Sequence, residues 1–257
     1  MKRIVVKVGS HVLSEQNRLA RERITNLVEL LCDLQQKYEV ILVSSGAVAA
    51  GYSKLKIDKS ILANRQAIAS VGQPYLMSVY QKKFAAADIL TAQVLLTADD
   101  FDSRKRTAHA KSAVSKLLKY NIIPIINEND TTATEELVFG DNDQLSAHVA
   151  YYFDADMLVI LSDIDGYYDS DPRENKNAKI LKEVSQIRDE DLEIPCDPNH
   201  AFATGGIATK LKAAKFLLEH KREMFMTTGF DLSIIRSFLL EGKQIGGTHF
   251  CKEIPCV

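Results

Sequence analysis

The chain has 257 residues, of which 46% are hydrophobic and 26% are charged, and its formal net charge is −2. These proportions are typical of a globular protein that forms one large domain or two closely packed lobes. The near-zero charge and the scattered basic residues argue against nucleic-acid binding and against binding to an anionic membrane, so we expect a small-molecule partner.

Cysteine usage and hydropathy indicate a reducing compartment. The four cysteines form no C-x-x-C pair and are too sparse for a disulfide scaffold or a zinc site. The amino-terminal "MKRIVVKVGS" contains Lys7 inside an apolar run that is too short for a signal core, and no later segment has the apolar length of a membrane span. We therefore predict a cytosolic protein.

Short β-branched runs alternate with longer segments of helical period along the chain. Strands are predicted over 3–8, 39–45, 121–127 and 156–163, and helices over 20–38, 61–86, 103–120, 144–153 and 204–220. This order favours an α/β/α sandwich with a mainly parallel central sheet, buried on both faces by helices. Since neither a linker nor an internal repeat is visible, we expect residues 1–257 to form a single domain.

Four polar clusters follow predicted strands: "KVGS", "SSGA", "NENDTT" and "SDIDGYY". In open α/β sheets, ligands bind beyond the carboxyl ends of the strands, where helix N-termini also point. The recurrence of polar clusters at these positions predicts a ligand site along one edge of the sheet.

The first cluster contains Lys7, an ionisable residue inside an otherwise apolar strand. Its burial is unfavourable unless a partner or a bound anion compensates the charge. Gly9 follows and would let the backbone approach a ligand. The alternative is a lysine at a strand end whose ammonium group reaches solvent.

The second cluster, "SSGAVAAG", places Ser45 and Gly46 at a strand-to-helix junction that favours an anion. Gly46 and Gly51 have the glycine spacing of a phosphate loop, but Tyr52 stands where that motif requires lysine, so the P-loop interpretation fails. A serine that caps a helix explains the hydroxyl equally well, and both interpretations stay open.

The third cluster, "NENDTTATEELVFGDND", predicts a strand end, a short hairpin over 135–139 and a turn at Gly140 that starts a helix. Acidic residues near a helix N-terminus are locally favourable, which accounts for one or two of Asp141, Asn142 and Asp143. It does not account for Asn127, Asn129 and Asp130 as well. Such a crowd of donors and acceptors suits a zwitterionic or polyhydroxy ligand, with the amides of Asn127, Asn129 or Asn142 available to a carboxylate.

The last motif is "TGGIATK", residues 204–210, in which a glycine-rich turn leads into a helix and ends at Lys210. Such a turn can hold phosphate oxygens, and the lysine adds a charge that could follow a transferring group. Two glycines in a loop are common, so this motif alone is weak. The six histidines show no pair at metal-ligand spacing.

Six blocks taken in order resemble the amino acid kinase family: "VVKVGS", "SSGAVAAG", "INENDTTAT", "GDNDQLSA", "SDIDGYYDSDPR" and "TGGIATKLKAA". The resemblance extends from Lys2 to about Phe250, and the pairing of "NEND" with "GDND" points to the branch that phosphorylates glutamate. It implies an ATP-dependent enzyme that transfers the γ-phosphoryl group to the side-chain carboxylate of L-glutamate, which yields L-glutamyl 5-phosphate for proline biosynthesis.

The resemblance also assigns roles to residues. Lys7 and Lys210 would contact the phosphates, Asp143 would hold both lysines, and Gly9 and Gly46 would lend backbone N–H groups. Mg²⁺ would arrive with ATP, because the sequence contains no obvious protein cage for it. The nucleotide-binding segments would be Ser162 and Asp163 together with Thr204, Gly205, Gly206, Ile207, Ala208, Thr209 and Lys210.

The positions that match the glutamate site are Ser45, Asp130 and Asn142, and the polar clusters add Gly46, Asn127 and Asp141 as candidates. Residues 1–150 would then form the acceptor lobe and residues 151–257 the nucleotide lobe. Two substitutions depart from the family pattern. Ser162 replaces a usual threonine and keeps the hydroxyl, whereas Ala208 replaces a usual serine and removes one phosphate contact.

Two alternatives remain within this fold. A relative could act on another acceptor, such as acetylglutamate, carbamate, a nucleoside monophosphate or isopentenyl phosphate. Phosphorylated acceptors need basic groups, whereas the polar segment that follows the predicted strand 121–127 is rich in Asp and Asn. A non-catalytic amino-acid sensor is disfavoured by the retained Lys7, Asp143 and Lys210. The resemblance further implies a homo-oligomer and inhibition by proline, and we expect the small RNA-binding-like domain of many family members to be missing.

Overall fold

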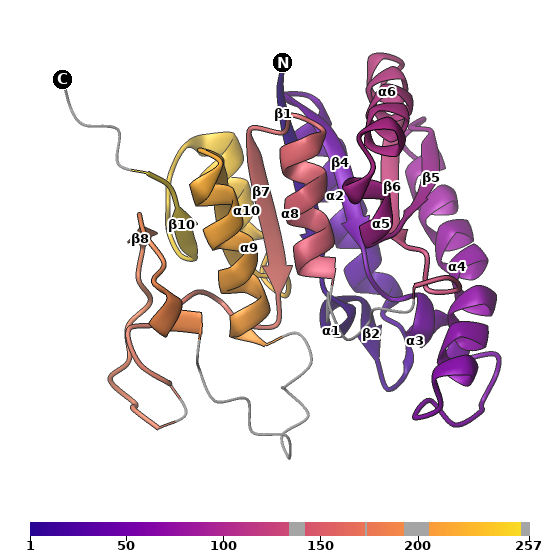
Figure 1. The fold of residues 1–257 in the computed structure, drawn as a ribbon, viewed down its shortest axis with the longest axis horizontal. Helices are drawn as coiled ribbons and strands as arrows, with labels where there is room; N and C mark the ends of the chain where they lie inside the picture. Colours follow the sequence, from indigo (N-terminus) through magenta and orange to yellow (C-terminus); the bar gives the residue numbers. More distant parts are fainter. Residues whose placement is uncertain (134–141, 173, 193–205, 253–257) are drawn as a thin grey trace.

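The computed structural model describes residues 1–133, 142–172, 174–192 and 206–252 (Figure 1). Eight of its strands form one sheet in the order β5-β6-β4-β1-β7-β9-β10-β8. The observed pairs are parallel, except that β10 runs antiparallel to β9. The strands are β1 (Lys2–Val8), β4 (Tyr38–Ser44), β5 (Thr91–Leu96), β6 (Ile123–Glu128), β7 (Met157–Ser162), β8 (Glu183–Val184), β9 (Glu223–Thr228) and β10 (Thr248–Phe250).

Helices cover both faces of this sheet, which confirms the predicted α/β/α sandwich. One face packs against α2 (Arg21–Gln35), α4 (Leu62–Ala85) and α10 (Ser233–Arg236). The other packs against α5 (Ala98–Asp102), α6 (Arg104–Lys119), α8 (Asn142–Tyr152) and α9 (Ile207–Glu219), and α8 and α9 lie in front of the sheet in Figure 1. The remaining elements are α1 (Ser10–Leu13), β2 (Ser14–Glu15), β3 (Arg18–Leu19), α3 (Ala47–Tyr52), η1 (Asp189–Leu192) and η2 (Ser237–Glu241).

The alternation of side chains along β1 divides the core into these two layers. Ile4, Val6 and Val8 belong to the layer under α2, whereas Val5 belongs to the layer under α8 and α9. Because successive strand residues point to opposite faces, Lys7 lies on the same face as Val5. The only charged side chain of the buried part of this strand is therefore directed toward α8.

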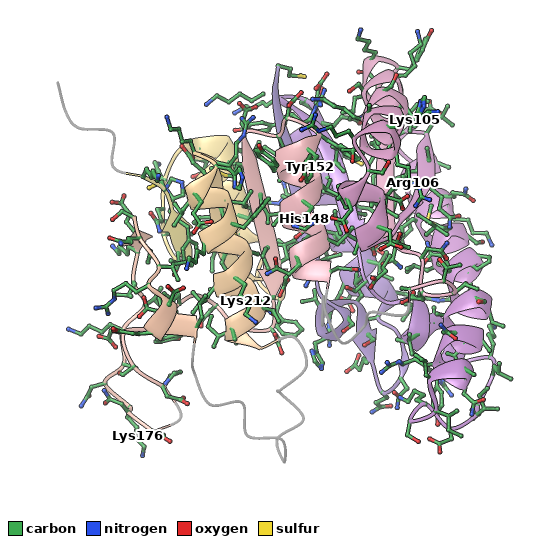
Figure 2. All side chains as sticks on the ribbon, viewed as in Figure 1. Lys105, Arg106, His148, Tyr152, Lys176 and Lys212 are labelled. Carbon is green, nitrogen blue, oxygen red and sulfur yellow. The ribbon has the colours of Figure 1, made fainter. Side chains whose placement is uncertain are left out.

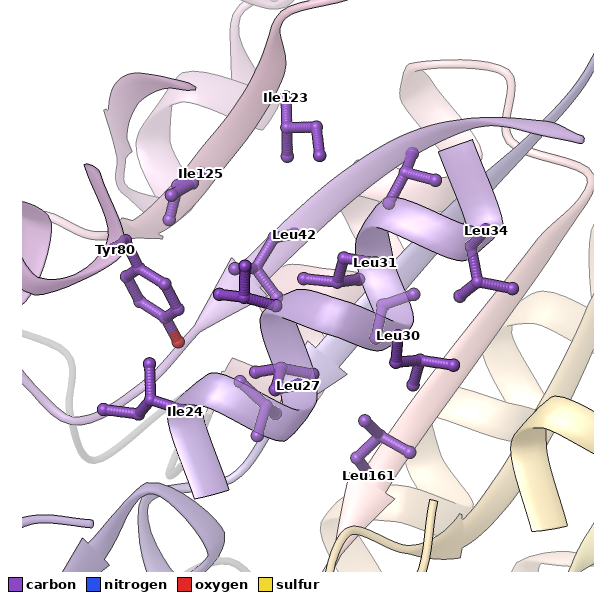
Figure 3. Close-up of a cluster of buried hydrophobic side chains, with 14 of the residues drawn as sticks. Ile24, Leu27, Leu30, Leu31, Leu34, Leu42, Tyr80, Ile123, Ile125 and Leu161 are labelled. Carbon is purple, nitrogen blue, oxygen red and sulfur yellow. The ribbon is translucent and has the colours of Figure 1, made fainter. Parts of the chain in front are cut away.

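The layer under α2 contains leucines of that helix. Leu27, Leu31 and Leu34 are fully buried or nearly so and belong to the same buried cluster as Leu42 of β4 (Figure 3). Tyr80 of α4 is buried in the same cluster, and its hydroxyl lies 2.9 Å from that of Ser44 at the end of β4. Burial of this apolar surface holds α2 and α4 against the sheet.

The predicted elements occur with shifted boundaries. The helices expected over 20–38, 61–86 and 103–120 are α2, α4 and α6, each shorter by a few terminal residues. The strands β5 and β9 were not predicted, because "TAQVLL" and "EMFMTT" mix polar and apolar residues without clear alternation. Among the described residues, none of the helices is long and apolar enough to cross a membrane.

A glycine pair brings α3 and α4 into direct backbone contact. A Cβ atom on Gly51 would lie 1.8 Å from the carbonyl oxygen of Ile68, and one on Gly72 would lie 1.8 Å from that of Ala47. Any side chain at either position would force the helices apart. Gly51 therefore serves helix packing, which explains the incomplete phosphate-loop motif, and the contact fixes α4 beside the carboxyl end of β4.

Candidate active site

The polar clusters meet at one edge of the sheet because the strands that precede them are parallel and adjacent. Val8 of β1 lies opposite Ser44 of β4 and opposite Leu161 of β7, so these strands end at the same level. Helices that begin near this edge include α3 at Ala47, α8 at Asn142 and α9 at Ile207. Residues that are far apart in sequence thus come together there, as expected for ligand sites in open α/β sheets.

Two lysines share one carboxylate at the centre of this edge. The Lys7 Nζ atom lies 2.6 Å from Oδ1 of Asp143, and the Lys210 Nζ atom lies 3.1 Å from Oδ2. The exposed fractions are 1% for Lys7, 0% for Asp143 and 3% for Lys210. Lys7 is therefore buried with its charge, and the alternative of a lysine that reaches solvent does not hold.

The charges around Asp143 determine its protonation state. Burial by itself raises the pKa of this carboxyl, but the Lys7 and Lys210 ammonium groups and the hydrogen bonds from Lys7 and Thr209 lower it below its ordinary value. The carboxylate is thus ionised at neutral pH. Two cations against one anion leave a net positive charge in a water-poor site, where an anionic ligand is strongly favoured.

The start of α9 contributes a third contact to Asp143. The Thr209 hydroxyl lies 2.9 Å from Asp143 Oδ2 and 2.9 Å from the carbonyl oxygen of Gly206, which precedes the helix. The amide of Gln144 donates to the Thr209 carbonyl at 3.1 Å, which ties α8 to α9. The first turn of α9, with Gly206, Ile207 and Ala208, therefore begins next to the carboxylate that holds both lysines, and its N–H groups have no partner within the helix.

The turns after β1 and β7 continue this edge of the sheet. Gly9 donates its N–H to the Leu161 carbonyl at 3.1 Å, and a Cβ added to Gly9 would lie 3.8 Å from the Lys7 ammonium. Ser162 is buried and donates to Asp163 Oδ1 at 2.9 Å. His11 of α1 lies 3.5 Å from the other Asp163 oxygen. The predicted positions Gly9, Ser162 and Asp163 thus lie at the ends of β1 and β7, and Gly9 lies beside Lys7.

A separate set of buried amides lies beside the ends of β4 and β6. The Asn142 amide nitrogen has three acceptors: Asn127 Oδ1 at 2.8 Å, Ser45 Oγ at 3.1 Å and the Ser44 carbonyl at 3.3 Å. The Asn127 amide nitrogen donates to Gln73 of α4 at 2.9 Å. The two hydrogens of the Asn142 amide are therefore used inside the protein, so this residue is not the donor to a ligand carboxylate that we expected.

Ser45 and Gly46 have different roles at the strand-to-helix junction. Gly46 is the N-cap of α3 with φ of 107°, a left-handed conformation that favours glycine. Within the described residues, α3 receives no side-chain cap, so the interpretation of Ser45 as a helix cap does not hold. The Ser45 hydroxyl instead accepts a hydrogen bond from Asn142, which joins the junction to α8.

Asp130 lies in the turn that follows β6, close to the first turn of α4. Burial raises the pKa of its carboxyl to about 6, although the nearby Arg65 guanidinium opposes this change. A partly dehydrated carboxylate at this position is an acceptor for a ligand cation such as an ammonium group. Thr131 also faces α4, since its hydroxyl lies 3.0 Å from that of Ser70.

The structure leaves part of the prediction undescribed and adds residues to it. Asp141, Thr204, Gly205 and the predicted hairpin over 135–139 lie outside the described residues. Sequence reasoning missed Arg65 and Gln73, both on α4. A glutamine that interrupts the buried positions Ile68, Ala69, Leu76 and Met77 of a helix was the available indication of Gln73.

A family model described as "Amino acid kinase family" matches residues 2–227. The match covers most of the chain, including the lysine pair, Asp143 and the amide cluster. The likeness extends to a solved structure, the carbamate kinase from Giardia lamblia bound to AMP-PNP, with a TM-score of 0.66 at 14% identity over 98% of this chain and 99% of that one. The chain belongs to the amino acid kinase family.

Particular relatives are much more similar in sequence. A protein of Wolinella succinogenes named glutamate 5-kinase is 54% identical over 97% of this chain and 98% of its own length. A glutamate 5-kinase of Leishmania donovani is also 54% identical, over 99% of this chain and 97% of its own length. These likenesses confirm the family predicted from the six sequence blocks and the branch indicated by "NEND" and "GDND".

Proposed function

We propose that this protein transfers the γ-phosphoryl group of ATP to the side-chain carboxylate of L-glutamate and so forms L-glutamyl 5-phosphate. The observation that carries the proposal is the buried Lys7–Asp143–Lys210 cluster, next to an amide and carboxylate site suited to an amino acid. The names of the relatives that share half of its residues agree with this reaction. Its product would enter proline biosynthesis.

The chemistry requires alignment and charge neutralisation more than acid–base catalysis, because the acceptor carboxylate is already ionised. A glutamate side-chain oxygen forms a bond to the γ-phosphorus as the bond from that phosphorus to the β–γ bridging oxygen breaks, and ADP leaves with the electron pair. Lys7 and Lys210 would neutralise charge on the transferring group. Asp143 would hold both ammonium groups in place, while the N–H groups of the first α9 turn would bind phosphate oxygens. The Gly9 N–H is already donated to the Leu161 carbonyl, so Gly9 would instead leave space beside the Lys7 ammonium group.

The amino-acid end of glutamate would bind at the other side of the cluster. Asp130 would accept the α-ammonium group, while Ser45, Gly46 and Asn142 would lie between this end and the phosphates. Asn127 would act by holding Asn142, since the two amides are 2.8 Å apart. Recognition of glutamate and phosphoryl transfer would then occupy opposite ends of the substrate.

Mg²⁺ would be bound mainly through ATP. Magnesium prefers several oxygen ligands, and the buried Asp143 carboxylate is already engaged by two lysines and a threonine. Among the described residues, His, Cys, Asp and Glu form no group of three placed to hold a metal ion. The phosphate oxygens of ATP therefore fit the ion best. When bound, it supplies positive charge to the phosphate oxygens.

Proline inhibition and self-association are part of the same proposal. Proline carries a carboxylate and a charged nitrogen, as the amino-acid end of glutamate does, so it would compete at Asp130. An excess of glutamate should relieve such inhibition; inhibition that glutamate does not relieve would place proline elsewhere. The homo-oligomer and the cytosolic location remain predictions.

ADP release, measured across glutamate, acetylglutamate, aspartate and UMP, tests the function directly. We expect release that depends on glutamate, together with an acyl phosphate that hydroxylamine traps as a hydroxamate. Turnover of acetylglutamate or UMP in preference to glutamate would reject the proposed acceptor. Glutamate binding without ADP release would favour the amino-acid sensor instead.

A further inference from the structure

The buried amides of Asn142, Asn127 and Gln73 form a chain whose direction is set by two backbone groups. The Ser44 carbonyl can only accept, so the Asn142 atom 3.3 Å from it is the amide nitrogen. The Glu128 N–H can only donate, so the Asn127 atom 2.9 Å from it is Oδ1. Both side-chain orientations follow from these contacts without reference to a ligand.

The same logic fixes the orientation of Gln73. Since the Asn127 amide nitrogen faces α4, the Gln73 atom 2.9 Å from it is the acceptor Oε1. The Gln73 amide nitrogen is then the other end of the chain. Gln73 is 8% exposed, and its Nε2 atom is buried and lacks a hydrogen-bond partner among the described residues. An amide donor left in this state is unfavourable, so a bound group is the natural partner.

The surroundings of Gln73 place this donor at the acceptor end of the site. Gln73 lies two helical turns from Arg65 on the same face of α4, and the Arg65 charge acts on Asp130. Ser70, one turn before Gln73, contacts Thr131 beside Asp130. This face of α4 therefore lies along the end of β6 and the turn that follows it, where the amino-acid end of glutamate would bind.

We propose that Gln73 is a specificity-determining residue whose Nε2 donates a hydrogen bond to the α-carboxylate of the bound amino acid. The inference rests on the proposed function. An α-carboxylate lies one carbon from the α-ammonium group, so its donor must lie close to Asp130. Asn142 has no amide hydrogen left for it, whereas Gln73 offers a buried donor and Arg65 adds a favourable positive charge.

Gln73→Glu separates this role from a purely structural one. The substitution is nearly isosteric and keeps an oxygen that can accept from Asn127, but it replaces the unpartnered Nε2 donor by a second oxygen. We expect kcat/KM for L-glutamate to fall about a hundredfold, mainly through KM, with the KM for ATP unchanged. L-isoglutamine, in which the α-carboxylate is a neutral carboxamide, should be affected far less, so the ratio between the two substrates should shift at least about tenfold.

Equal losses for glutamate and isoglutamine, or a normal KM for glutamate, would overturn the proposal. Gln81→Glu is the matched control, because it makes the same change at an exposed position of α4. It should alter neither the rate of glutamate phosphorylation nor the ratio between glutamate and isoglutamine. If Gln73→Glu does not fold, as judged by circular dichroism, Gln73→Met is used instead. It also lacks the amide donor, and the ratio of kcat/KM for glutamate to kcat/KM for isoglutamine is again the readout. A wild-type protein that does not phosphorylate glutamate would reject the proposed function before any variant is compared.

Discussion

The candidate site has two ends, which differ in the kind of side chain that they bury. The transfer end buries three charged side chains, Lys7, Asp143 and Lys210, in contact with one another. The acceptor end buries neutral amides, Asn142, Asn127 and Gln73, in a single directed chain. The charges would stabilise a transferring phosphoryl group, which is itself charged, whereas neutral amides would orient the substrate without adding charges that compete for its ionic groups.

The two ends are joined by neighbouring residues at the start of α8. Asn142 and Asp143 are about 100° apart around a helix of 3.6 residues per turn, so they point to different strands. Asn142 reaches the end of β4, and Asp143 reaches Lys7 of β1. The start of α8 thereby sets the distance between the amide chain and the lysine cluster. Substitutions at the two ends should consequently have separable effects.

The largest effect is expected from Asp143→Ala, which would leave two buried lysines without their shared counter-charge. Breaking a buried ion pair by removing one partner costs about 3–5 kcal/mol of stability. Urea unfolding would measure this loss. Asp189→Ala is the control: it breaks an ion pair with Lys215 at the surface, whose loss should leave the stability nearly unchanged. Equal losses for the two variants would contradict a structural role for the buried cluster.

Lys7→Met and Lys210→Met should lower kcat while the fold is retained. Each removes one charge directed at the transferring group, which corresponds to about 3 kcal/mol, or roughly a hundredfold in rate. Steady-state ADP release measures the effect. Lys212→Met is the control, because Lys212 lies on the same helix but is exposed (Figure 2). Near-normal turnover in a folded Lys7→Met protein would remove that lysine from the transfer end.

Asp130→Ala should act on the acceptor end alone. Loss of a charged partner for the α-ammonium group is expected to raise the glutamate KM by an amount equivalent to about 1.5–3 kcal/mol, with little change in the ATP KM. Measurement of both KM values decides the matter. A variant that lost ATP affinity and kept glutamate affinity would show that the polar cluster after β6 serves the nucleotide.

The smallest effect is a pH dependence of glutamate binding. Because the pKa of Asp130 is raised to about 6, its carboxylate form, which would bind the ammonium group, is lost as pH falls through that value. The glutamate KM should therefore rise about tenfold per pH unit below pH 6 and be flat above pH 7. KM measured from pH 5 to pH 8 tests this, and Asp130→Asn should remove the dependence. A KM that stayed constant across this range would contradict it.

In the absence of substrate, the raised pKa of Asp130 affects stability in the opposite direction, because it makes the folded protein more stable at low pH than at high pH. Asp130 binds its proton more tightly when folded than when unfolded, so its contribution to stability decreases as pH rises from about 4 to about 6. Glutamate should offset this loss by supplying an ammonium partner. Thermal unfolding with and without glutamate at pH 5 and pH 7 would show a larger stabilisation by glutamate at pH 7.

Local chemistry was enough to predict the layers, the long helices and most of the site positions. Apolar periodicity predicted α2, α4 and α6, and an ionisable residue in an apolar strand marked Lys7 as a candidate. The order of the motifs predicted the family, which the matching family model and the named relatives confirm. Periodicity, a lysine within an apolar run and the order of motifs are all visible along the chain, so they can be recognised in a single sequence. The strands β5 and β9 were missed because their residues alternate weakly and pairing in the sheet decides their conformation.

Only the tertiary structure decided which groups at the site face one another. The sequence by itself determined that Lys7, Asp143 and Lys210 were candidates and that Asn127 and Asn142 were polar residues near strand ends. That Asp143 contacts both lysines, that the Asn142 donors are used inside the protein, and that Gln73 of α4 joins the acceptor end depend on parallel strands ending at one edge and on the Gly51–Gly72 contact. These contacts join residues many positions apart, and hydrogen-bond direction is fixed by geometry, which residue type and spacing do not specify.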